Sequence, residues 1–268
     1  MYDVVIRGGT VVDAEQHIAA DLAIQDGKIA ALAPTVAEAG KTEIDATGLI
    51  LLPGGIDPHV HFNEPGRAEW EGFATGTRAL AVGGITTCFD MPLNSTPPVT
   101  TTSAFDAKQR AAQQSSLVNC YLWGGLIPGN LDQLEALYER GTIGFKAFMS
   151  NSGIDDFPTV DDYTLLEGMR IAASLGSIVA VHAENDTITQ VCAQSALHAG
   201  HLSVRDYLDS RPVIAELEAI QRAIMFAGET GCKLHIVHVS TGRGVELVLA
   251  GQKQGVDVSC ETCPHYLV

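Results

Sequence analysis

The 268-residue sequence has little of several features that define whole classes of protein. It contains no run of 18 apolar residues, so no segment is expected to span a membrane. Only 16 residues are Lys or Arg against 32 Asp or Glu, which gives a net charge of −16. Nucleic-acid binders need the opposite balance to neutralise phosphates, and anionic lipid would be repelled as well. The N-terminus also lacks the basic and long apolar regions of a secretory signal. We therefore expect a cytoplasmic protein with neither a nucleic-acid nor a membrane partner.

Cysteine pairs with the spacing of a metal ribbon or a disulfide framework are also scarce. Of the six cysteines, Cys260 and Cys263 form one C-x-x-C, and no second such pair accompanies it. Apolar residues nevertheless make up 46% of the chain, which is enough for a sizeable core. A globular protein without cysteine cross-links is expected.

The first 52 residues consist of short β-rich pieces separated by Gly and Asp turns. These pieces lie at residues 4–6, 10–12, 21–24 and 27–30. Such a texture is typical of hairpins in a small antiparallel sheet, and a few short strands rarely stand alone. We predict that residues 1–52 are the N-terminal part of a small β domain, similar to a β-sandwich, whose other strands lie elsewhere in the protein.

From residue 53 onwards, apolar strand-like runs alternate with helix-like segments. The runs lie at residues 55–57, 84–89, 118–122, 143–148, 177–181, 234–237 and 256–259. Helix-like segments lie between them, for example at 131–140, 161–175 and 213–230. Strands that are apolar on both faces indicate a parallel sheet covered by helices. Repeated βα units form either a doubly wound sheet or a (β/α)₈ barrel.

Polar side chains stand where these runs end, and they decide between the two folds. His59, His61, Lys146, His182 and His238 all occupy such positions. In a barrel the strand C-termini meet on one face, whereas in a doubly wound sheet they spread along an edge. Candidate ligands from four strands therefore favour an α/β fold with a (β/α)₈ TIM-type barrel in residues 53–268.

The histidines are of the residue type that binds transition metals. His59 and His61 alternate along one strand, so their imidazoles share a face and can bind one metal together. His182 and His238 each follow an apolar strand, and neutral imidazole suits zinc and related metals. Any one of them alone could be a packed or surface residue, but four strand-end histidines are hard to explain as coincidence. His235 precedes His238 by three residues, on the opposite strand face, and is left out of the set.

Lys146 is the unusual member of the set, because it interrupts the otherwise apolar run at residues 143–148. Burying an unpaired ammonium is expensive, and a protonated lysine would repel divalent cations. A lysine that has reacted with CO₂ carries a carbamate, which is anionic and has two oxygens able to bridge two metals. Carboxylation would therefore resolve both the burial problem and the repulsion.

The string GIDPHVHFNEPG at residues 55–66 resembles the cyclic amidohydrolases of the metal-dependent amidohydrolase superfamily. Within that family, the strings at residues 67–73, 90–95 and 145–150 look most like those of the allantoinase branch. The resemblance runs through residues 261–267 and so covers this whole chain, but only the first part of a family member. The family fold is the barrel that the strand pattern predicts.

The resemblance implies two divalent metal ions, with zinc as the first choice and cobalt, manganese or iron as alternatives. His59 and His61 would bind the first metal, His182 and His238 the second, and carboxylated Lys146 would bridge them. A hydroxide between the metals would open a small cyclic ureide, converting allantoin to allantoate in purine degradation. Asn94 and Ser150, just past strand ends, are predicted substrate contacts. A homotetramer is also implied.

Three alternatives remain open. Dihydroorotases usually carry Arg where Asn63 stands, and dihydropyrimidinases or hydantoinases usually lack the Glu64-Pro65-Gly66 continuation. Both differences favour a neutral hydantoin-type ring such as allantoin. The third alternative is a non-catalytic scaffold relative, against which the filled ligand positions argue.

The length of the chain leads to a further expectation. Residues 53–268 are fewer than the ~250 of a complete barrel and provide about seven of its eight strands. Family members carry a general-base aspartate at the end of the eighth strand, and no such residue is present before Val268. We therefore expect a C-terminally truncated chain that lacks its final barrel strand and is inactive by itself.

Overall fold

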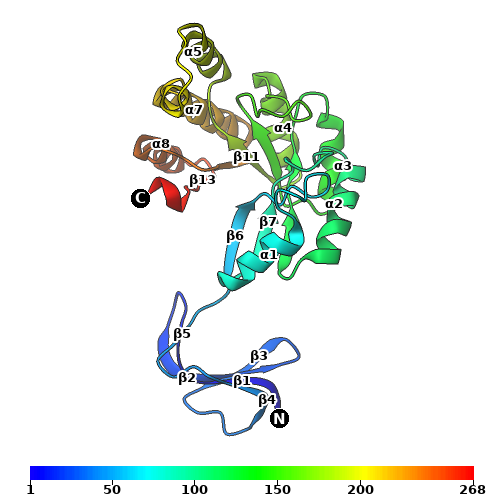
Figure 1. The fold of residues 1–268 in the computed structure, drawn as a ribbon, viewed down its shortest axis with the longest axis vertical. Coiled ribbons are helices and arrows are strands. Elements are labelled where there is room, and N and C mark those ends of the chain that lie inside the picture. The colour runs from blue at the N-terminus through cyan, green and yellow to red at the C-terminus, as the bar shows by residue number, and fades with distance from the viewer. The chain divides into compact units, whose positions relative to one another are not determined.

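The computed structural model describes residues 1–268 and separates into two compact units, Met1–Gly55 and Ile56–Val268. Figure 1 shows both, with the elements labelled along the chain. The first unit is made of strands alone, and the second alternates strands with helices. No helix is both long and apolar enough to cross a bilayer.

The first unit is one five-stranded sheet. Its strands are β1 (Tyr2–Val12), β2 (His17–Gln25), β3 (Lys28–Ala33), β4 (Gly40–Asp45) and β5 (Ile50–Leu51). The order is β3-β2-β1-β4, and β5 also pairs with β1. Asp26 and Gly27 both adopt positive φ, at 51° and 70°, which suits the tight turn that joins β2 to β3. The expected antiparallel pairing holds for β1, β2 and β3, but β4 and β5 run parallel to β1.

The second unit contains two parallel sheets, ordered β6-β7-β8 and β13-β12-β11-β10-β9. The strands are β6 (Gly55–Val60), β7 (Ile85–Asp90), β8 (Asn119–Leu122), β9 (Gly124–Gly125), β10 (Phe145–Phe148), β11 (Ile178–His182), β12 (Lys233–Ile236) and β13 (Val258–Cys260). Only Trp123 separates β8 from β9, so the two are halves of one strand position. Their spatial order follows the sequence order, as in a TIM-type barrel, with about seven strand positions occupied.

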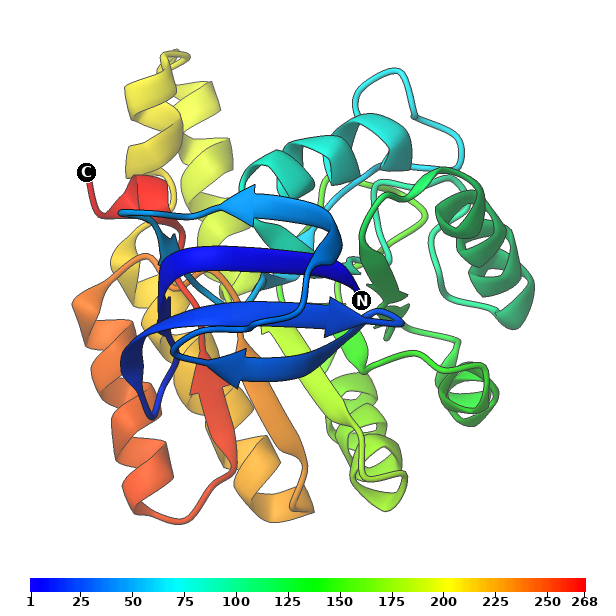
Figure 2. The same ribbon diagram turned by 90° about the horizontal axis from the view of Figure 1, so that it is seen from below.

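Helices follow the strands and cover them from outside, as Figure 2 shows for β11, β12 and β13. Their bounds are α1 (Phe73–Val82), α2 (Thr102–Ser115), α3 (Leu134–Glu139), α4 (Asp162–Ser174), α5 (Asp186–His198), α6 (Val204–Asp209), α7 (Val213–Thr230) and α8 (Gly242–Lys253). Short 3₁₀ turns occupy Leu131–Gln133 and Pro264–Tyr266. The inward faces of these helices and the strands form one apolar core, which includes Phe105, Leu165, Val179 and Ile220.

Side-chain N-caps define where several of these helices begin. Thr101, Asp161, Asn185, Ser203 and Thr241 each accept a hydrogen bond from a backbone N–H in the first helical turn through their side-chain oxygen. These N-caps satisfy backbone donors that have no partner inside the helix. Each cap therefore defines the residue at which the preceding loop ends and the helix begins.

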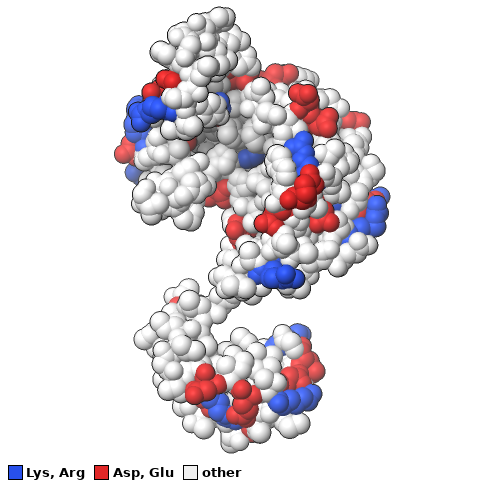
Figure 3. All heavy atoms as spheres, in the orientation of Figure 1, with Lys and Arg blue, Asp and Glu red and all other residues white.

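Charged side chains are mixed over the surface of the second unit. On the face drawn in Figure 3, acidic and basic residues intermingle, and no continuous basic patch is visible. This distribution agrees with the low Lys and Arg content of the sequence.

Candidate metal centre

The first strand of the barrel presents two histidines whose ring nitrogens face each other. His59 lies in β6 and His61 follows its last residue, and their Nε2 atoms are 3.2 Å apart. The ring centroids lie 5.2 Å apart. The strand alternation that predicted a shared face therefore brings both imidazoles to one point.

A second pair of histidines comes from two other strands. His182 is the last residue of β11, and His238 lies just past β12. His182 Nδ1 is 3.2 Å from His238 Nε2. His238 has φ of 38°, a backbone conformation that is rare outside glycine and that concentrates at functional sites. Its ring centroid also lies 5.6 Å from that of His59, so the two pairs are neighbours.

Lys146 lies in β10 and is buried without a partner. Its side chain is 1% exposed, and its Nζ makes no hydrogen bond. Its Nζ lies 5.0 Å from the ring centroid of Phe148. The Phe148 ring in turn stacks on that of His182, with the two centroids 4.7 Å apart. Burial lowers the pKa of Lys146 to about 7, against the opposing charge of Glu261. An amine with this pKa is largely neutral just above pH 7 and can then react as a nucleophile.

Three of the histidines, His61, His182 and His238, have lowered pKa values that favour the neutral form metals require. Burial lowers the pKa of His61 to about 3, with smaller contributions from His59 and Lys146. Burial is also the main reason that the pKa values of His182 and His238 are lowered, and Lys146 contributes to both. Because Lys146 acts on members of both pairs, it is the buried polar group that the two pairs share.

These residues fit a metal centre only if Lys146 takes part. No group of three or more His, Cys, Asp and Glu side chains is arranged to hold one metal ion. Each histidine pair therefore needs a further ligand, and an unpartnered buried amine adjacent to both is suited to provide it after carboxylation. Neutral imidazoles and carboxylate-type oxygens are ligands that zinc and related metals accept.

Two glutamates hold the outer sides of the histidine pairs. Glu261 contacts His59 Nδ1 with one oxygen, and His235 Nε2 lies 3.3 Å from the other. Glu184 Oε2 lies 2.7 Å from His182 Nε2, and Arg211 binds both oxygens of this carboxylate. Burial alone would raise the pKa of each carboxyl, but the neighbouring imidazoles, and for Glu184 also Arg211, lower it well below its usual range. Both are therefore ionised.

Glu261, Glu184 and Arg211 are not among the residues predicted from the sequence. Glu261 directly follows β13, so the strand-end criterion that found the histidines also applies to it. His235 was left out because it precedes His238 by three residues. The structure places it beside Glu261, with its Nδ1 2.8 Å from Ser259 Oγ. No sequence pattern links Glu184 to Arg211, which lies 27 positions further along the chain.

The predicted substrate contacts lie in loops after strand ends. Ser150, just beyond β10, is completely buried, and its hydroxyl has no hydrogen-bond partner. Asn94 has a positive φ of 69°. It follows Leu93, whose carbonyl oxygen is 3.5 Å from His61 Nδ1. Neither side chain has a recorded contact with the histidines, so their role in binding remains a prediction.

The Glu64-Pro65-Gly66 segment has a structural role in the loop after β6. Glu64 Oε2 accepts a hydrogen bond of 2.9 Å from the Phe73 N–H at the start of α1. Thr96 N donates to Pro65 O, and a Cβ on Gly66 would lie 2.7 Å from Thr96 O. The segment therefore joins the loop after β6 to the loop after β7, which carries Asn94.

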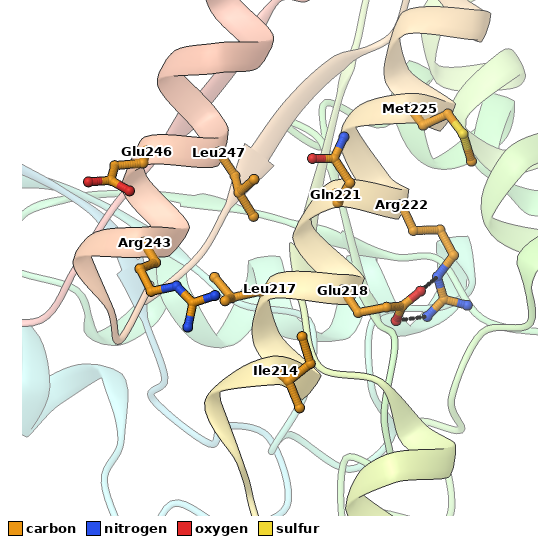
Figure 4. A pocket seen from close by; sticks show the side chains of 9 residues that line it. All are labelled: Ile214, Leu217, Glu218, Gln221, Arg222, Met225, Arg243, Glu246 and Leu247. Atoms are coloured by element: carbon orange, nitrogen blue, oxygen red, sulfur yellow. Dashed lines mark hydrogen bonds and ion pairs between the residues drawn. The ribbon is translucent and has the colours of Figure 1, made fainter.

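Two cavities in the second unit differ in whether predicted site residues line them. A groove of about 640 Å³ lies between α7 and α8 and is lined by Leu217, Met225, Arg243 and Leu247 among others (Figure 4). None of the predicted site residues lines it. A second cavity, of about 370 Å³, is lined by His182, Glu184, Arg211, His238 and Tyr266 and so adjoins the second histidine pair.

The sequence profile of the amidohydrolase family matches residues 50–265, and the chain belongs to this family. Among curated proteins, the allantoinase of Rubrobacter xylanophilus is 57% identical over 267 residues, and that of Deinococcus radiodurans is 53% identical over 265. These alignments cover 100% and 99% of this chain but 59% of each relative. The chain thus spans about three fifths of the length of these curated relatives.

Solved structures give the same family and a related activity. The L-hydantoinase (dihydropyrimidinase) of Arthrobacter aurescens superposes with a TM-score of 0.94 at 38% identity. The match covers 100% of this chain and 59% of that one. A D-hydantoinase from a Bacillus species superposes with a TM-score of 0.90 at 34% identity. The expected TIM-type barrel fold is thereby confirmed.

Proposed function

We propose that this chain provides the metal-binding part of a cyclic amidohydrolase that hydrolyses allantoin to allantoate. Two observations carry the proposal: two pairs of imidazoles with ring nitrogens 3.2 Å apart, and a buried Lys146 that has no hydrogen-bond partner and whose charge acts on members of both pairs. The choice of allantoin as substrate rests on the curated allantoinases that are 53–57% identical to this chain. We further propose that residues 1–52 and 53–268 belong to separate domains.

In this proposal His59 and His61 hold one divalent metal, and His182 and His238 hold the other. Lys146 supplies a bridging carbamate after its neutral amine has added to CO₂ and released a proton. Zinc is the preferred metal, because four imidazoles and a carboxylate-type bridge suit it. When bound, two such metals supply Lewis acidity toward the ring amide and lower the pKa of water.

The chain's own residues have further roles in the proposal. Ser150 and Asn94 orient the ureide ring beside the metals, and the unpartnered Ser150 hydroxyl is free to donate to a ring carbonyl. The outer glutamates keep the histidines in place. A cytoplasmic location and a homotetramer complete the proposal, and the homotetramer rests on the family resemblance alone.

The test uses protein expressed from its whole reading frame and loaded with Zn²⁺, Co²⁺ or Mn²⁺. We expect ring opening of allantoin, measured as allantoate formation, and loss of activity in Lys146→Met. The hydantoinase structures make a hydantoinase or dihydropyrimidinase the second candidate. Turnover of 5-substituted hydantoins or dihydrouracil without turnover of allantoin would select it, and turnover of dihydroorotate alone would refute both. Protein that purifies without metal and cannot be reconstituted would instead indicate a scaffold.

A further inference from the structure

Each histidine pair contains one ring whose outer nitrogen is bound to a carboxylate. In the first pair this is His59, held through Nδ1 by Glu261. In the second pair it is His182, held through Nε2 by Glu184 at 2.7 Å. The same arrangement thus occurs twice, from different strands and through different ring nitrogens.

A carboxylate oxygen at hydrogen-bond distance from an imidazole nitrogen accepts the N–H of that nitrogen, so we infer that the ring nitrogen beside each glutamate carries the proton. His59 is therefore protonated at Nδ1, which leaves the lone pair on Nε2, the atom that faces His61 Nε2 at 3.2 Å. His182 is protonated at Nε2, which leaves the lone pair on Nδ1, the atom that faces His238 Nε2 at 3.2 Å. The two rings have opposite tautomers, yet each directs its free nitrogen at its pair partner.

A further residue lies against each glutamate, Arg211 against Glu184 and His235 against Glu261. Arg211 binds Glu184 through Nε at 2.9 Å and through a second nitrogen, the two-point geometry that gives guanidinium–carboxylate pairs their directionality. His235 Nε2 lies 3.3 Å from Glu261, and its other ring nitrogen is 2.8 Å from the Ser259 hydroxyl. Arg211 therefore fixes the orientation of Glu184, whereas Glu261 has only the 3.3 Å contact with His235, whose Nε2 makes no hydrogen bond.

We propose that Glu261 and Glu184 are positioning residues that impose opposite tautomers on His59 and His182 and thereby define two separate metal half-sites. The inference rests on the proposed metal centre, but the tautomers belong to the metal-free chain. Outer partners of this kind are typically worth about 10–100-fold in metal affinity. Each glutamate should affect the half-site that contains its own histidine.

The first experiment reads the tautomers directly. Metal-free protein from the whole reading frame, labelled with ¹⁵N at histidine only, is studied by magic-angle-spinning NMR, with signals assigned by single histidine substitutions. We expect proton-bearing Nδ1 in His59 and proton-bearing Nε2 in His182. The same tautomer in both rings, or the reverse assignment, overturns the proposal without any glutamate variant having to fold.

The second experiment measures the affinity of each half-site by Zn²⁺ titration against a competing chelator. Glu261→Ala should weaken one of the two binding steps ~10–100-fold and change the His59 and His61 signals, and Glu184→Ala should do the same for His182 and His238. The Gln variants should restore part of the affinity, because an amide oxygen still accepts the ring N–H. Glu218→Ala is the matched control, since Glu218 pairs with Asn185 and Arg222 and contacts no histidine.

The outcomes separate this inference from the proposed function. Equal weakening of both binding steps by either variant, or no weakening, overturns the positioning roles even if allantoin is hydrolysed. Wild-type protein that shows the two tautomers but binds no metal refutes the proposed centre while leaving the tautomer assignment intact.

Discussion

The ion pair between Asp90 and Lys108 supports the loops that carry the candidate site, and we expect its disruption to be costly. Asp90 ends β7, Lys108 lies in α2, and both side chains are at most 1% exposed, with Nζ 2.9 Å from Oδ2. Asp90 Oδ1 also accepts a 3.0 Å hydrogen bond from the Phe62 N–H, directly after His61. Lys108 Nζ donates to Met91 O at 2.7 Å.

The perturbation is Lys108→Met, which keeps the length of the side chain and removes its charge. Burial already raises the pKa of Asp90, and the variant removes the cation that favours its charged form, while Met91 O loses its donor. Removing one partner of a buried ion pair typically costs about 3–5 kcal/mol of unfolding free energy. The double variant Asp90→Asn/Lys108→Met removes both charges, and its Asn oxygen can still accept from Phe62 N. We expect it to recover at least about 1 kcal/mol of that loss.

The assay is urea denaturation followed by far-UV circular dichroism and tryptophan fluorescence. Trp123, buried in the barrel between β8 and β9, reports on this unit. Zinc titration of the same variants measures whether the displaced Phe62 backbone disturbs His61. A loss below about 1 kcal/mol for Lys108→Met, or a double variant less stable than the single one, would show that the pair does not support the site.

Three further predictions concern the site and its packing. Lys146→Met should abolish bound metal, measured by elemental analysis, and a metal content equal to wild type contradicts this. The variant should keep or raise the thermal midpoint of the metal-free protein, because it removes an unpaired buried amine. Metal-free protein should lose stability as pH falls below the unfolded-state histidine pKa of ~6.5, since the unfolded chain takes up protons that neutral buried histidines refuse. The loss is about 1.4 kcal/mol at pH 5.5 for a group such as His61, whose folded pKa is about 3, and an unchanged midpoint between pH 7 and 5.5 contradicts it. Gly76→Ala should lower the free energy of unfolding by about 1–3 kcal/mol, because the added Cβ would lie 2.2 Å from the Phe62 ring. Gly242→Ala is the control, since its Cβ meets open space and should cost nothing. Equal thermal midpoints for the two variants would contradict this prediction.

The strand pattern was sufficient to predict the barrel because apolar strand-like runs alternate with helix-like segments and four of the runs have a candidate ligand at or near their ends. The seven predicted runs correspond to the strand positions β6, β7, β8, β10, β11, β12 and β13, with ends shifted by a few residues. Parallel pairing of β4 and β5 with β1 was not predictable, because hairpin signals report only neighbours along the sequence.

Side-chain partners from distant segments were the part of the site that the sequence did not reveal. The alternation of side chains along a strand was the reason to leave His235 out of the site. However, β12 ends at Ile236, and His238 beyond it adopts φ of 38°, which is not a strand conformation. The period-two rule therefore stops applying between the two residues. Arg211 reaches Glu184 across the segment that contains α5 and α6, and no local periodicity encodes such a contact.

The contact between Glu261 and His59 joins residues 202 positions apart. During synthesis, a growing chain presents His59 and His61 long before the carboxylate that orients His59 has been made. If the proposed metal centre forms, a cation captured early would meet a ring that is still free to turn and could exchange again. Stable retention of metal would then come late in maturation, after folding has reached β13.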